Sequence, residues 1–160
     1  MGEYDDLLLE AYRGEVLGAA LFGAMADTEA DHGRREQLAA LREVEAQTAA
    51  RLQTLVETSG IDAGSDDSPR SDGVRLAEGA RDQPWLDFLS GLRSALPSYL
   101  EKFERLQTIG APGDPVLVEL VAHERAIDRF AELEGEGRSA EALAVLRAHL
   151  DGSRRGGLRV

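Results

Sequence analysis

Glutamates interrupt the apolar stripes of two long helical segments near the start of the chain. In the segment 3–26, apolar or small residues recur in steps of three and four, and Glu15 stands on the same stripe. In the segment 33–58, Glu45 and Thr48 interrupt a stripe that is otherwise made of leucines. At about 100° per residue, both glutamates fall within roughly 30° of the centre of their apolar face. We therefore expect both carboxylates to point into the protein interior.

A histidine and a glutamate are neighbours in a later helical segment, 115–135. His123 and Glu124 flank the centre of its apolar face, each roughly 50° away, so at least one of them should point inward. Carboxylates brought together in a dry interior repel one another, and they need a cation, a proton or a hydrogen-bonding partner. Oxygen ligands combined with an imidazole suit iron or manganese. Together with Glu15 and Glu45, this pair makes a candidate site for one metal ion.

The segments that carry these residues predict an all-α fold. Helical periodicity covers five stretches, whereas Val, Ile and Thr are sparse and nowhere alternate as they would in strands. Asp114 and Pro115 give a clear start signal, an N-cap residue followed by proline at the first helical position. Short connections favour antiparallel neighbours, so we expect a four-helix bundle capped by a short fifth helix. The expected helices lie at about 3–26, 33–58, 84–106, 115–135 and 140–150.

One long connection, 59–83, separates the second and third helices. It is rich in Gly, Ser and Asp, which indicates a polar connection rather than a core element. At roughly 3.3 Å per residue it could easily run the length of a helix of about 24 residues, which rises about 36 Å. A crossover between parallel helices is therefore feasible, and an up-down-up-down bundle is the alternative. We expect residues 1–152 to form one domain, followed by a flexible basic tail at 153–160.

Composition argues against several classes of function. The formal net charge of -12 opposes binding to phosphate backbones and to anionic lipid. The absence of cysteine excludes disulfides, thiolate metal sites and thiol catalysis. No apolar run is long enough to cross a bilayer, and the acidic N-terminus is unlike a signal peptide. We expect a cytoplasmic protein with no nucleic-acid or membrane partner.

The glutamates and the order of the helices resemble the ferritin-like superfamily, which includes rubrerythrins and other di-iron carboxylate bundles. In that pattern one Glu comes from each of two helices, and a Glu-x-x-His comes from each of the other two. Glu15 matches the lone glutamate of the first helix, while Glu45 and Glu124 match the two motif glutamates. The resemblance implies a ferritin-like bundle with a long crossover between its second and third helices.

The chain departs from that pattern at both histidines and in the third helix. Thr48 and Ile127 occupy the histidine positions, and the third helix offers Leu96 and Tyr99 where a glutamate is expected. A two-iron centre is therefore not expected. One hypothesis is a vestigial polar cluster in a helical protein that associates with a partner or with itself as a homodimer. The other is an iron- or manganese-binding redox or metal-handling protein, and the sequence does not decide whether it is an enzyme.

Overall fold

The computed structural model describes residues 2–156, which form six helices and no strand, so the all-α prediction is confirmed. None of the helices in this range is long and apolar enough to span a membrane. Asp114 caps α5 as expected, because its carboxylate accepts hydrogen bonds from the backbone N–H groups of Val116 and Leu117. The helices are α1 (Glu3–Thr28), α2 (His32–Thr58), α3 (Asp67–Ala80), α4 (Trp85–Ile109), α5 (Pro115–Gly135) and α6 (Ser139–Gly156).

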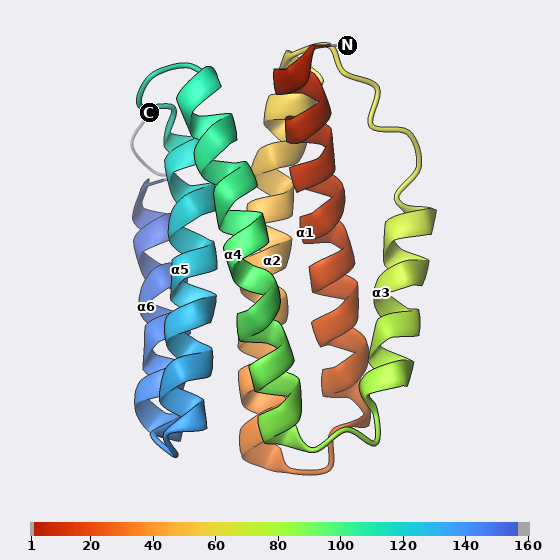
Figure 1. Ribbon diagram of the computed structural model, residues 1–160, viewed down its shortest axis with the longest axis vertical. Coiled ribbons are helices and arrows are strands. Elements are labelled where there is room, and N and C mark those ends of the chain that lie inside the picture. The colour runs from red at the N-terminus through yellow and green to blue at the C-terminus, as the bar shows by residue number, and fades with distance from the viewer. Residues whose placement is uncertain (1, 157–160) are drawn as a thin grey trace.

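The chain crosses the length of the bundle between α2 and α4. Figure 1 shows α1 running down from the N-terminal end, α2 returning upward, and the chain then descending beside α1 through α3. Helix α4 consequently starts at the same end as α2, and the two run in the same direction (Figure 1). Helix α1 packs mainly against α2 and α3, α4 packs against α5, and α6 packs against α5 and α2.

The prediction that 59–83 is a polar connection without an element of its own is wrong, because Asp67–Ala80 within it form helix α3. Only Pro69, Gly73 and Ala77 are buried in this helix, one on each turn, and the helix lies against α1. Small residues let two helices approach closely but bury little apolar area. The Gly, Ser and Asp residues of this stretch, which are typical of turns, led instead to the prediction of a connection.

A methyl group at Gly73 should force α3 away from α1. Its Cβ would overlap the carbonyl oxygen of Leu17 and lie 2.9 Å from the Cβ of Ala20. We expect Gly73→Ala to lower the free energy of unfolding by about 1–3 kcal/mol in urea denaturation, the usual cost of overpacking. In the matched control Gly79→Ala the new Cβ meets nothing within 4 Å, so stability should hold or rise by up to about 1 kcal/mol. Equal stabilities of the two variants would contradict the close approach of the helices.

The C-terminal helix is longer than predicted. It spans Ser139–Gly156, so the flexible tail expected at 153–160 is wrong as far as Gly156, and the rest of it lies outside the described residues. Ser153 is buried, and its hydroxyl donates to the Glu119 carboxylate. Arg51 pairs with that carboxylate and donates to the Ser153 carbonyl oxygen. These contacts with α2 and α5 hold the last turns of α6 on the bundle.

Two apolar cores succeed one another along the bundle. One includes Phe22 and Phe130, and the other includes Leu8 and Leu117. Along α1, α2 and α5, the change from one core to the other falls at or next to buried polar side chains. The candidate ligands therefore occupy a polar layer between two apolar layers.

Candidate metal centre

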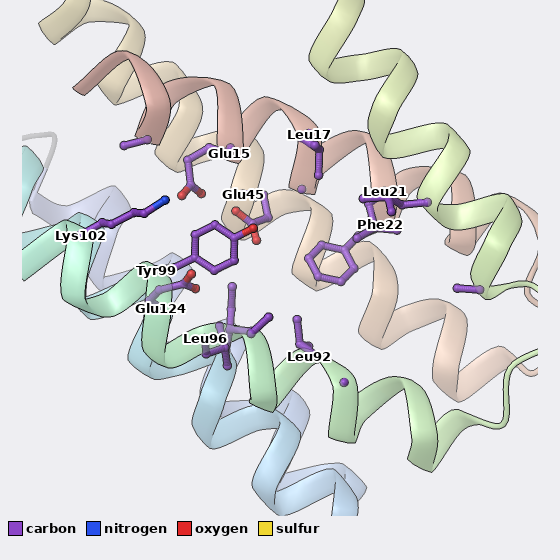
Figure 2. Close-up of a pocket in the computed structure, with 18 of the residues that line it drawn as sticks. Glu15, Leu17, Leu21, Phe22, Glu45, Leu92, Leu96, Tyr99, Lys102 and Glu124 are labelled. Carbon is purple, nitrogen blue, oxygen red and sulfur yellow. The ribbon is translucent and has the colours of Figure 1, made fainter. Parts of the chain in front are cut away.

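Three helices bring the predicted ligands together in this polar layer. Glu15 comes from α1, Glu45 from α2, and His123 and Glu124 from α5; Figure 2 shows the three carboxylates facing a common space. Their exposed fractions are 3%, 8%, 0% and 6%, in the same order. Glu15 and Glu45 are interior, as their places on the apolar stripes predict. Both α5 neighbours are interior as well, although the sequence required only one.

The His123 ring is oriented by its own helix. Its Nδ1–H donates to the backbone carbonyl oxygen of Leu120, which can only accept a hydrogen bond. This contact directs Nε2 toward the carboxylates, as is usual for imidazoles that bind metals. Nε2 lies 2.9 Å from Glu15 Oε2, 3.7 Å from Glu45 Oε2 and 3.9 Å from Glu124 Oε2.

Three of these residues form the tightest group. One ligand atom from each of Glu15, Glu45 and His123 lies within 4.8 Å of the others. Glu15 Oε2 and His123 Nε2 are close, yet their contact lacks hydrogen-bond geometry, and each atom is buried without a hydrogen-bond partner. Buried polar atoms are rarely left in this condition. Two facing lone pairs at this distance call for a proton or a cation between them.

Burial and mutual repulsion set the protonation of the cluster. Burial, reinforced by the charge of Glu15, raises the pKa of Glu45 well above its usual value. Burial also raises the pKa of Glu124 to about 7, against the opposing effect of His123 and with a further contribution from Glu45. For His123, burial lowers the pKa, but the neighbouring Glu15 and Glu45 outweigh it and the net shift is well upward. The cluster therefore has a strong affinity for positive charge, whether a proton or a metal ion.

At the positions where the ferritin-like pattern expects further ligands, the structure offers none either. Leu96 and Ile127 belong to an apolar core. The Thr48 hydroxyl donates to the Val44 carbonyl oxygen at 2.9 Å and is satisfied within its own helix. Tyr99 is 44% exposed and lies on the wall of a cavity. All candidate ligands among the described residues thus come from α1, α2 and α5, and the side facing α4 is open to that cavity.

The cavity beside the cluster has a volume of about 490 Å³. Residues of α1, α3 and α4 form most of its wall, which is mainly apolar, and Glu15, Glu45 and Glu124 of the cluster face it (Figure 2). Its other charged lining residues are Glu10, Arg75 and Lys102. Its size falls within the range of small-molecule sites. The contribution of α3 was not foreseen from the sequence, because that helix was itself not predicted.

A further buried carboxylate, Glu134, was also missed. Its two oxygens accept hydrogen bonds from Gln37 Nε2 at 2.7 Å and from Trp85 Nε1 at 3.1 Å. Only the fold brings these donors to it, since they lie on α2 and at the start of α4. With a donor for each oxygen, Glu134 ties three helices together and offers no free ligand.

No protein-family model, curated protein or solved structure matches this chain. The function must therefore be argued from the site itself, a buried group of two carboxylates and an imidazole with a third carboxylate beside it and a cavity on its open side.

Proposed function

We propose that this protein is a ferritin-like helical bundle that binds one divalent metal ion, iron or manganese. Glu15, Glu45 and His123 would hold the ion, and Glu124 would lie beside it. The observation that carries the proposal is the pair of buried, unpartnered atoms, Glu15 Oε2 and His123 Nε2, which face each other at 2.9 Å. An oxygen-rich donor set with a single imidazole favours iron or manganese over softer metals.

Spacing and charge support a shared cation. Nitrogen and oxygen ligands at about 2.1 Å from a metal and at right angles to each other are about 3 Å apart, close to the separation of Glu15 Oε2 and His123 Nε2. Two carboxylates and a neutral imidazole balance the charge of a divalent ion. The Leu120 carbonyl oxygen accepts from Nδ1–H of His123, so Nε2 is the atom that a metal ion would bind in place of a proton.

The ferritin-like assignment is supported by the path of the chain and by the helices that supply the ligands. Helices α2 and α4 run in the same direction after a long crossover (Figure 1), as in bundles of that kind. The proposal is also supported by Glu15, Glu45 and Glu124, which come from three different positions in the order of the helices, α1, α2 and α5. The missing carboxylate on α4 and the missing histidines support one metal ion rather than two.

Metal content is the direct test. Protein purified without an affinity tag or chelator should contain iron or manganese near one ion per chain by mass spectrometry. Chelated protein should regain one ion per chain from ferrous or manganous salts under anaerobic conditions. Glu134→Gln serves as the matched control, because Glu134 is also a buried glutamate but is hydrogen-bonded elsewhere, and this variant should keep the metal.

A smaller change, Gly18→Ala, should weaken metal binding without removing a ligand. Its new Cβ would lie 2.8 Å from the Glu45 Cδ and 3.0 Å from Oε1, so the carboxylate must move. We expect about tenfold weaker binding of Mn²⁺ by calorimetry, the lower end of the range for residues that orient ligands. Gly14→Ala, one turn earlier, meets nothing within 4 Å and should bind Mn²⁺ like the wild type. Unchanged affinity in Gly18→Ala would argue against Glu45 as a ligand.

The alternative is a metal-free cluster that shares a proton, in a protein whose role is association. Wild-type protein that takes up neither ion after incubation would overturn the proposal and leave this alternative.

A further inference from the structure

The cavity beside the cluster is elongated. Its lining residues extend from Leu7 to Phe22 on α1 and from Phe88 to Phe103 on α4. At 1.5 Å per residue, each of these stretches covers about 22 Å of helix. Helix α3 closes one side with the residues around Leu76 and Ala80. This shape suits an extended chain better than a compact ring system.

Polarity divides the cavity along its length. The pair Glu10 and Lys102 lies on the wall at one end. The cluster carboxylates come next, and Figure 2 shows Leu17, Leu21, Phe22 and Leu92 beyond them. The part toward Phe22 and Phe88 is mainly apolar, although Arg75 and Gln83 also line the cavity. About 10 Å of helix separates Glu15 from Phe22. A ligand with one polar end and a short apolar tail would match this order.

The carboxylates restrict the charge of the polar end. Glu15, Glu45 and Glu124 all line the cavity, and the cluster takes up a proton or a metal ion that balances its charge. Lys102 is already paired with Glu10. An anionic or a cationic head at this level would therefore be buried without a counter-charge. An uncharged hydroxyl can donate a hydrogen bond to a carboxylate, and the oxygen of a hydroxyl or carbonyl can bind a metal ion. Glu15 Oε2 supplies a buried atom without a hydrogen-bond partner at this level.

We propose that the cavity binds an uncharged straight-chain molecule with one terminal hydroxyl or carbonyl oxygen. The oxygen lies against the carboxylates of the cluster, and the alkyl chain lies between α1 and α4 toward Phe22 and Phe88. This inference deepens the proposed function by naming the class of molecule held next to the metal. This inference rests on the proposed function only where it places a metal ion next to the oxygen of the bound molecule.

Calorimetric titration with primary alcohols from butanol to decanol tests the proposal. Each added CH₂ should tighten binding up to about fourfold, until the apolar part is filled and the affinity stops rising. At equal chain length, octanol should bind at least tenfold more tightly than octanoate or octylammonium. Trp85, the one tryptophan of the chain, stacks on Phe88 at the apolar end, so its emission reports whether the tail arrives there.

A matched pair of variants locates the binding. Gly91 lines the cavity, and a Cβ there meets nothing within 4 Å, so Gly91→Leu fills the apolar part with little strain. It should weaken octanol binding at least tenfold, while Ser94→Leu, on the same helix and outside the lining, should not. Equal effects of the two variants, or tighter binding of octanoate or octylammonium than of octanol, would overturn the inference.

The two proposals can fail separately. Octanol binding that survives in protein unable to take up iron or manganese would leave this inference standing and remove the metal centre. Metal uptake in protein that does not bind octanol would support the metal centre and overturn this inference.

Discussion

Replacing Glu15 by glutamine and Glu45 by leucine together should abolish metal binding and make the metal-free protein more stable. Both carboxyl groups are buried, and burial without a cation is unfavourable for them whether they are charged or protonated. Leucine at position 45 replaces a buried carboxylate with an apolar group, and the glutamine amide can donate to His123 Nε2. Exchange of a buried ionic group for apolar packing often stabilises a protein by about 1–4 kcal/mol. Urea denaturation with chelator present measures the gain, and Mn²⁺ titration measures the loss of binding.

Glu134→Gln should show the opposite combination. Each oxygen of Glu134 accepts a hydrogen bond, one from Gln37 and one from Trp85. Glutamine replaces one of these oxygens with an NH₂ group that cannot accept, so stability should fall by about 1–3 kcal/mol, and metal binding should persist. The double variant and this control therefore differ in both readouts. Retained Mn²⁺ binding in the double variant would remove Glu15 and Glu45 from the centre, and a stability loss of several kcal/mol would show that their charges are already well paired.

Helical periodicity was enough to place Glu15 and Glu45 in the interior. Each lies near the centre of an apolar stripe, and a helix that packs on one face buries that centre. The same rule did not decide whether His123 or Glu124 points inward, because they flank the centre of the apolar face on opposite sides. Both are buried because α5 packs against α2, α4 and α6 and therefore buries a wider face than one neighbour would require.

Helical periodicity could not give the distances within the cluster, and it could not show which residues form the wall of the cavity. Periodicity fixes the direction of a side chain about its own helix, but the rotation of one helix against another depends on all of the packing. Helix α3 was not predicted because the Gly, Ser and Asp residues of 59–83 indicated a turn-rich connection, and because the buried residues of the helix are small. The end of α6 escaped because its partners, Arg51 and Glu119, are distant in sequence.

Without metal, the protein should lose stability as pH rises from about 4.5 to 7. Glu124 has a pKa of about 7 in the folded protein, against 4.5 ordinarily. Between these values the folded protein holds a proton that the unfolded chain has released, so a rise in pH favours unfolding. The difference corresponds to about 3 kcal/mol from Glu124 alone. The raised pKa values of Glu45 and His123 act in the same direction, since in each case the folded protein binds the proton more tightly.

Chemical denaturation at a series of pH values, with chelator present, measures how the free energy of unfolding changes with pH. Glu124→Gln keeps the shape of the protonated side chain and cannot ionise, so it should match the wild type near pH 4.5 and exceed its stability at pH 7. A flat or rising profile for the metal-free wild type would mean that Glu124 is not held protonated by its surroundings. Bound metal should reverse the trend, because a cation competes with protons for Glu15, Glu45 and His123 and therefore stabilises the fold more as pH rises.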